Sequence, residues 1–219
     1  PFRLRHFLEC DTIVTDGNGG RGSTSPGPRS PELSERKDDM PILEITGLKK
    51  TYTTRLGGNR VEALKNVSFT AETGEYIAIM GESGSGKTTL LNILAALDKP
   101  TGGSVLLDGM DLAKIKESKL ADFRRDNLGF VFQEFNLLDT FTVRDNILLP
   151  LVLRGEKYPA MQPKLQSTAE LLGISSLLDK YPYEISGGQK QRTAAARAMI
   201  TEPKLLLADE PTGALDSRS

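Results

Sequence analysis

The sequence contains a single cysteine, Cys10, among its 219 residues. One thiol excludes an internal disulfide and a thiolate metal cluster, and such sparing use of cysteine fits a reducing cytosol. Long apolar runs are also missing. Runs such as 90–97 and 147–153 are much shorter than the roughly eighteen residues that cross a bilayer. We therefore expect that the chain does not span a membrane by itself.

An excess of charge of one sign is absent as well. The sequence has 28 Lys and Arg against 29 Asp and Glu, a formal net charge of −1. This balance gives no indication of a nucleic-acid-binding surface or of a polybasic membrane anchor. The length and the 38% of hydrophobic residues are enough for one sizeable core with a small subdomain attached.

The first 39 residues have little that could fold. Residues 16–39 are dense in Gly, Pro, Ser and charged residues, so they bury too little apolar surface to offset the entropy of ordering. Residues 2–14 lack the hydrophobic core and cleavage site of a secretory signal. We predict that residues 1–39 are a disordered or non-native leader, and that Met40 is a plausible natural start.

From Ile42 onward, short apolar runs alternate with glycine and polar turns. These runs predict strands at 42–48, 61–71, 75–80 and 103–109, several of them in an antiparallel sheet. A helical pattern covers 87–97, and a Leu-rich stretch broken by Pro150, Pro159 and Pro163 predicts a helical subdomain at about 134–185. The continuous apolar run 205–208 predicts a strand buried on both faces of a parallel sheet.

A glycine-rich loop lies between the predicted strand 75–80 and the predicted helix. Residues 81–88 match the pattern G-x-x-x-x-G-K-[ST] in the strand-loop-helix context that gives this pattern its meaning. Backbone N–H groups of such a loop point at phosphate oxygens, and the helix dipole favours the anion. Lys87 would neutralise β- and γ-phosphate charge, Thr88 would bind Mg²⁺, and Thr89 would face the α-phosphate. The phosphate-binding loop consists of Gly81, Glu82, Ser83, Gly84, Ser85, Gly86, Lys87 and Thr88.

Two adjacent carboxylates follow the apolar run 205–208. Asp209 is predicted to hold Mg²⁺, and Glu210 to orient or deprotonate the water that attacks the γ-phosphorus. An Asp-Glu pair alone is usually a solvated loop. The buried strand before the pair and the phosphate loop upstream favour the catalytic interpretation.

A third motif, Ser186-Gly187-Gly188-Gln189, begins an alanine-rich helix. On its own it would be a helix-capping turn, although its hydroxyl and N–H groups could also hold a phosphate. With the phosphate loop and LLLADEP in this order, the sequence resembles the ATP-binding cassette (ABC) ATPases over about residues 42–219. The resemblance implies an α/β P-loop NTPase fold: a RecA-like parallel sheet core, an antiparallel β subdomain and an inserted helical subdomain.

The resemblance also assigns roles to three further residues. Gln133 matches the glutamine that contacts Mg²⁺ and the attacking water, Tyr52 matches the aromatic that stacks on adenine, and Asp216 matches the loop that crosses between subunits. In this family ATP lies between the phosphate loop of one subunit and the Ser-Gly-Gly-Gln motif of a second, which implies a head-to-tail homodimer. The family's γ-phosphate histidine is missing, because the only histidine is His6. We therefore expect residues 40–219 to be an ABC ATPase domain that is incomplete at its C-terminus and hydrolyses ATP poorly.

Within the family, residues 96–109, 123–151 and 213–216 resemble ATPase subunits of bacterial peptide-resistance exporters of the bacitracin type, which are related to macrolide and lipoprotein-release systems. The resemblance implies a subunit that binds and hydrolyses ATP and powers a separate membrane permease. The permease would export or remove antimicrobial peptides or related amphiphiles, and the subunit would be cytoplasmic, on the inner face of the membrane. Residues 139–143 and 146–153 would dock the permease, unless they simply pack inside the helical subdomain.

Two other functions fit the same motifs. A soluble ABC ATPase that acts on DNA or ribosomes usually carries two cassettes, coiled-coil insertions or basic linkers, and none is visible in the sequence. A cassette that binds ATP without turnover is the other alternative, and the presence of Glu210 argues against it.

Overall fold

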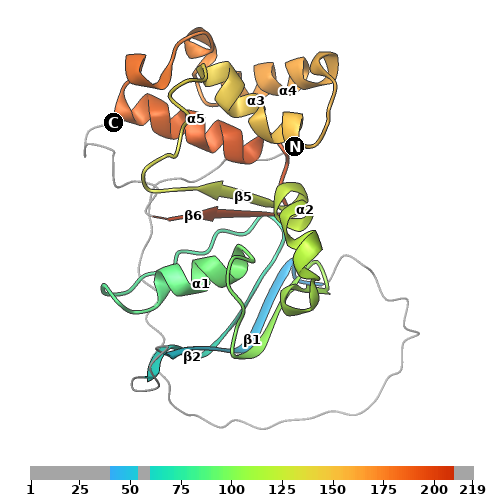
Figure 1. Ribbon diagram of the computed structural model, residues 1–219, viewed down its shortest axis with the longest axis vertical. Coiled ribbons are helices and arrows are strands. Elements are labelled where there is room, and N and C mark those ends of the chain that lie inside the picture. Colours follow the sequence, from blue (N-terminus) through green and yellow to red (C-terminus); the bar gives the residue numbers. More distant parts are fainter. Residues whose placement is uncertain (1–39, 54–59, 210–219) are drawn as a thin grey trace, which may run out of the picture.

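The computed structural model describes residues 40–53 and 60–209. The predictions for the leader 1–39, for Glu210 and for Asp216 fall outside these residues. Figure 1 shows a group of helices on one face of a small parallel sheet. On the opposite face of that sheet lie the helix α1 and then the antiparallel sheet. In the described part of the chain, no helix is long and apolar enough to cross a bilayer.

The antiparallel sheet contains four strands in the order β2-β1-β3-β4. Its strands are β1 (Leu43–Thr53), β2 (Arg60–Ala71), β3 (Gly102–Leu107) and the short β4 (Met110–Asp111). Leu43, Ile45 and Leu48 of β1 are at most 2% exposed, because one face of the sheet packs into the core. The predicted strands 42–48, 61–71 and 103–109 and their antiparallel arrangement are thus confirmed.

The predicted strand 75–80 is wrong. These residues form no ladder with any described part of the chain, and Tyr76 and Met80 are 73% and 72% exposed. An extended segment becomes a strand only when a neighbour satisfies its backbone N–H and C=O groups. The described parallel sheet has only two strands, β5 and β6, so the apolar run has no ladder to join.

The parallel pair consists of β5 (Leu128–Val131) and β6 (Leu205–Ala208). The strand predicted at 205–208 is confirmed, but its burial on both faces is not. Leu207 is buried at 4% exposure, whereas Leu206 is 43% exposed. The physical reason is that the covering helix α5 (Gly187–Met199) packs mainly over β5.

Gly129 of β5 lets α5 come close to the sheet. A Cβ atom at this position would lie 2.4 Å from the carbonyl oxygen of Ala198, which is too short for any real contact. The main core lies on the opposite side of β5 and β6. There, apolar residues of the antiparallel sheet pack against Leu207 and the helix α1 (Lys87–Leu94), with α2 (Glu117–Asn127) contributing Phe123.

The remaining helices enclose a second hydrophobic core. They are α3 (Val143–Leu153), α4 (Tyr158–Leu171), the short 3-10 turns η3 (Ser175–Leu177) and η4 (Pro182–Glu184), and α5. Pro150 and Pro163 lie inside α3 and α4 and do not break them as the sequence suggested. Each proline removes one N–H donor, a loss that helices with well-buried faces tolerate here. The limits 134–185 for a helical subdomain remain a prediction.

Candidate functional site

The glycine-rich loop opens α1 with a backbone that only glycine adopts easily. Gly86 is the N-cap of α1 with φ 94°, a left-handed conformation. A Cβ atom there would also lie 2.5 Å from the carbonyl oxygen of Ala63 on β2. The loop is therefore seated against β2. Six of its members are exposed to solvent, namely Gly81, Glu82, Ser83, Gly84, Ser85 and Thr88.

Lys87 folds back over this loop. Its ammonium donates to the carbonyl oxygens of Gly81 at 2.6 Å and Glu82 at 2.9 Å. Among the described residues, no side chain caps the N-terminus of α1, and no acidic residue lies in its first turn. Uncapped N–H groups, the helix dipole and the Lys87 ammonium combine into a site that favours a phosphate group.

The candidate metal ligands lie in two places. The N–H of Asp209 donates to the carbonyl of Val131 at 3.0 Å, and Val131 pairs with Ala208 across the parallel sheet. Asp209 and Gln133, which are far apart in the sequence, thus follow adjacent strands at the same edge of the sheet. Among the described residues, no hydrogen bond or ion pair joins Asp209 to Lys87 or Thr88, so the structure does not connect this edge to the phosphate loop.

The oxygen donors of this edge suit a hard cation. At this edge Asp209 offers a carboxylate and Gln133 a neutral oxygen, while Thr88 offers a hydroxyl oxygen in the separate phosphate loop. No three His, Cys, Asp or Glu side chains in the described ranges converge as a metal site.

The Ser-Gly-Gly-Gln motif caps α5 as its simpler interpretation requires. The Ser186 hydroxyl accepts from the N–H of Gln189 at 3.3 Å, and the Gln189 side chain accepts from the N–H of Ser186 at 2.8 Å. This reciprocal pair is a capping box. Ser186 and Gly187 are exposed, and Gly188 and Gln189 partly so. The helix α5 lies on the face of the β5–β6 sheet opposite α1, so the two candidate phosphate sites of one chain are on different sides of the sheet (Figure 1).

Tyr52 lies near the end of β1 that is close to the phosphate loop. It pairs with Val61 of β2, and two residues further along β2 the carbonyl of Ala63 faces Gly86. Tyr52 is 41% exposed as a residue. Tyr52 and the contact point of the loop on β2 therefore lie on the same pair of strands.

Sequence reasoning missed residues that support the candidate site. Lys50 and Asp98 contact Tyr52. The guanidinium of Arg197 on α5 donates to backbone carbonyls just after Gln133. Isolated charged residues at these positions carry no motif, and only the tertiary structure brings them to their partners.

Comparison with known proteins agrees with this geometry. The family model described as "ABC transporter" matches residues 64–213. The bacitracin export ATP-binding protein BceA of Halalkalibacterium halodurans is 54% identical over 180 residues, which are 82% of this chain and 70% of that protein. The ABC transporter ATP-binding protein YxdL of Bacillus subtilis is 52% identical, over 81% of this chain and 68% of that protein.

Solved structures show the same similarity. The ATP-binding cassette MJ0796, in a dimeric post-hydrolysis state bound to ADP and Pi, superimposes with a TM-score of 0.71 and 38% identity. The match covers 80% of this chain and 77% of that one. Sequence, fold and the phosphate loop agree, and the chain belongs to the family of ABC transporter ATPases.

Proposed function

We propose that the chain is the ATP-hydrolysing subunit of a bacterial transporter that exports or removes antimicrobial peptides or related amphiphiles through a separate permease. The observation that supports this most is the position of the two phosphate-binding motifs. The Lys87 loop and the Ser186 helix end lie on opposite faces of one sheet (Figure 1). One chain cannot close both around a single nucleotide, so each motif needs its complement from another chain.

The phosphate loop would bind the triphosphate. Lys87 would exchange its loop carbonyls for β- and γ-phosphate oxygens, with the N–H groups of residues 81–89 completing the contacts. Mg²⁺, when bound, would neutralise the charge on the transferred phosphoryl group. Thr88, Asp209 and Gln133 would hold it through their side-chain oxygens or through bound water.

Hydrolysis would depend on Glu210, which follows Asp209 directly in the sequence. A carboxylate at this place can align a water molecule in line with the γ-phosphorus and accept its proton. Gln133, from the adjacent strand, would share in holding that water. Phosphoryl transfer needs mainly this alignment and charge neutralisation, so few residues suffice.

A second cassette would complete the site. The capping box uses the Ser186 oxygen as an acceptor, which leaves the hydroxyl hydrogen and the exposed N–H of Gly187 to donate to the γ-phosphate of a partner's nucleotide. Asp216 would lie near the subunit boundary. The related cassette MJ0796 is described as dimeric, which supports a head-to-tail homodimer for this chain.

A permease would dock on the loop before α3. Asn146, fully buried, donates to the carbonyls of Leu138, Phe141 and Thr142 and accepts from the N–H of Leu138 at 2.8 Å. The loop is thereby fixed from beneath, while Leu138 and Phe141 remain 43% and 37% exposed. Such a rigid, partly apolar surface suits a partner protein. The inward-facing residues of 143–151 serve internal packing instead.

The names of related proteins support the proposed class of transported compound. One relative is a bacitracin exporter subunit, and the macrolide exporter MacB of Rhodopirellula baltica, 44% identical over 80% of this chain and 26% of its own length, joins ATP-binding and permease parts in one chain. A subunit that docks on a permease in this way would act at the cytoplasmic face of the membrane, with residues 40–219 as the ABC ATPase domain and about 134–185 as its helical subdomain.

Reconstitution tests the proposal. The chain, co-expressed with the permease of its own operon, should co-purify with it in detergent, and peptide substrate should raise phosphate release several-fold above the basal rate. Phe141→Asp should weaken co-purification without affecting ATP affinity. Co-purification with ribosomes or DNA in place of the permease would contradict the proposal.

A further inference from the structure

The hydroxyl of Tyr52 donates to the carboxylate of Asp98, which also accepts hydrogen bonds from two other groups. Tyr52 donates to Oδ2 of Asp98 at 2.8 Å. Oδ1 of Asp98 accepts from the Lys50 ammonium at 2.5 Å and from the N–H of Lys99 at 2.7 Å. With both oxygens engaged, the carboxylate has little freedom to turn, so the phenol oxygen has a fixed partner.

Lys50 is an unusual residue because its side chain is almost entirely buried. It is 8% exposed, and its ammonium donates to the carbonyl of Lys99 at 2.7 Å in addition to Asp98. The same ammonium lies 4.8 Å from the centroid of the Tyr52 ring. A desolvated cation at this distance attracts the π electrons of the ring. Tyr52 is thus restrained at its hydroxyl and at its ring.

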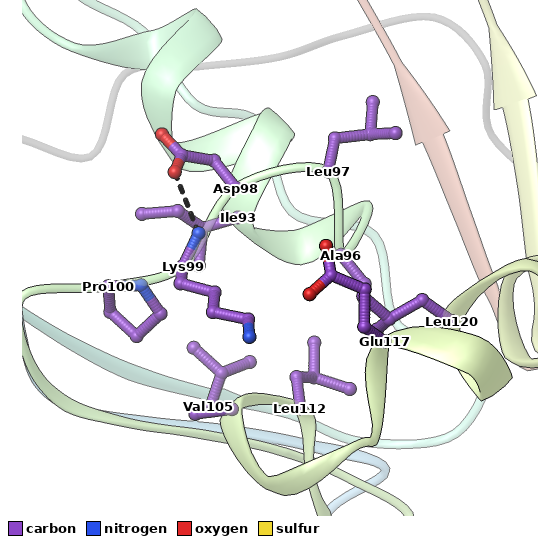
Figure 2. A pocket seen from close by; sticks show the side chains of 11 residues that line it. Ile93, Ala96, Leu97, Asp98, Lys99, Pro100, Val105, Leu112, Glu117 and Leu120 are labelled. Atoms are coloured by element: carbon purple, nitrogen blue, oxygen red, sulfur yellow. Dashed lines mark hydrogen bonds between the residues drawn. The ribbon is translucent and has the colours of Figure 1, made fainter.

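The segment 98–100 receives part of its anchoring from these bonds. On another side it borders a cavity of about 340 Å³ lined by Ile93, Val105, Leu112 and Leu120 among others. Figure 2 shows the side chains of Asp98, Lys99 and Pro100 around this cavity, with the Asp98 carboxylate accepting from the backbone N–H of Lys99. The cavity gives no close packing on this side, so the Lys50 bonds add to the backbone bonds from Asp98 to Asn92 and from Thr101 to Lys49 in holding the segment.

The restrained ring is available to a ligand. Tyr52 as a whole is 41% exposed, and its strand pairs with β2, against which the phosphate loop is seated. Val61, its partner, is two residues from Ala63, a separation of about 7 Å along a strand. A single nucleotide could therefore place its base on the ring and its phosphates in the loop. An ordered ring loses less entropy when such a group binds.

From these contacts we infer that Lys50 and Asp98 are positioning residues that hold Tyr52 ready for the purine base of the nucleotide. The inference rests on the proposed role of Tyr52 and extends it. Lys50 and Asp98 touch neither base nor phosphate; they fix the ring through its hydroxyl and its face. Losing either one should weaken the contribution of the base to binding and leave the contribution of the phosphates unchanged.

Two ligands separate these contributions. ATP carries a base, and inorganic tripolyphosphate has the phosphates without it. Calorimetric titration of the full chain with each ligand should show that Lys50→Met, Asp98→Asn and Tyr52→Phe bind ATP about 3- to 10-fold more weakly, the size of one lost hydrogen bond. Their affinity for tripolyphosphate should stay within about twofold of the affinity of the original chain for this ligand.

The matched control is Glu156→Gln, which removes a carboxylate paired with Lys164 at 2.8 Å in the helical part of the chain. It should change neither affinity. Tyr52→Phe leaves the Lys50–Asp98 pair intact, so it keeps the test decisive if a change at the buried pair prevents folding.

Two results would overturn the inference in distinguishable ways. If Tyr52→Ala weakens ATP binding while Lys50→Met, Asp98→Asn and Tyr52→Phe do not, the ring binds the base without positioning residues, and the proposed function stands. If Tyr52→Ala leaves ATP affinity unchanged, the role of Tyr52 in the proposed function fails and the inference fails with it. Equal weakening of ATP and tripolyphosphate in the variants would indicate a general loss of structure and would also overturn it.

Discussion

The guanidinium of Arg197 donates to the carbonyl of Asn136 at 2.6 Å. Its other nitrogen donates to the carbonyl of Phe135 at 2.7 Å. Phe135 and Asn136 both have positive φ, 61° and 46°, which turns their carbonyls toward α5. Burial lowers the pKa of Arg197 from its ordinary value. The helix that begins at Ser186 and the loop that follows Gln133 are therefore mechanically joined.

Arg197→Met should destabilise the protein and slow ATP turnover. Two carbonyls of a left-handed turn would lose their donor, at a cost of about 1–3 kcal/mol, and the Gln133 loop would be released from α5. Arg197→Lys should recover only part of this loss because an ammonium cannot reproduce the planar fork. Urea unfolding and phosphate release measure the two effects.

The matching control for Arg197 is Arg144, which pairs with the exposed Asp179 at 2.7 Å. Arg144→Met removes a surface ion pair worth about 0–1 kcal/mol. If Arg197→Met proves no more disruptive than Arg144→Met, the link between α5 and the loop does not matter for stability.

Gly86→Ala should abolish ATP binding and destabilise the fold. The new Cβ atom would meet Ala63 at 2.5 Å, and φ 94° is strained for alanine. Gly109→Ala is a matched comparison, because Gly109 also has positive φ, 73°, but has nothing within 4 Å of an added Cβ. It should show the smaller loss of stability, about 1 kcal/mol, and keep ATP affinity. Titration with ATP and thermal unfolding distinguish the two.

Lys87→Met should weaken ATP binding at least tenfold with little change in stability. The ammonium is the one side-chain cation in the phosphate loop, and charge-assisted bonds to phosphate are the strong ones. Lys164→Met, in α4, removes the same charge at a distance and should bind ATP normally. Equal ATP affinity of the two variants would exclude Lys87 as a phosphate ligand.

Glu210→Gln should bind ATP and release phosphate at least tenfold more slowly, an increase in the barrier of about 1.4 kcal/mol or more. A nucleotide that is bound but not hydrolysed should hold two cassettes together, so sedimentation with ATP should show a dimer. Undiminished turnover would remove Glu210 from the water-positioning role.

The stability that Asp98 contributes should depend on pH. Partial burial alone would raise the pKa of Asp98, but the hydrogen bonds from Lys50, Tyr52 and the N–H of Lys99 outweigh it, so the pKa falls below its ordinary 3.8. A carboxyl with a lower pKa in the folded state adds stability above about pH 3.8, and the gain disappears as the pH falls through the folded pKa. The difference in unfolding free energy between the original chain and Asp98→Asn should therefore shrink below about pH 4. A difference that stays constant from pH 7 to pH 3 would contradict it.

Motifs and periodicity predicted much of this molecule. The strands of the antiparallel sheet follow from alternating apolar residues such as Leu43 and Ile45, and the helix after Lys87 follows from its loop. The predictions that were wrong depend on which other segments pack against the residues. The run 75–80 has strand-like residues but no ladder in the described structure, and Leu206 is apolar but only partly covered. Whether an apolar residue is buried depends on what packs against it, which the local sequence does not contain.

The contacts of Arg197 and of the Lys50–Asp98 pair were beyond sequence reasoning for the same cause. Their partners lie 61 and 48 residues away. Nothing in a short window predicts that a lysine of β1 becomes buried beside an aspartate at the end of the α1 region. Motifs predict groups that act on ligands, while the residues that orient these groups become visible only in three dimensions.

The two bonds from Lys87 to the loop carbonyls have a consequence for how a nucleotide is captured. Through these bonds the ammonium ties the backbone of Gly81 and Glu82 to the first turn of α1. Capture is then an exchange reaction, in which each new bond to phosphate replaces one already made. The measured affinity reports the difference between the two sets of bonds, so it will understate the attraction between the lysine and the phosphates themselves.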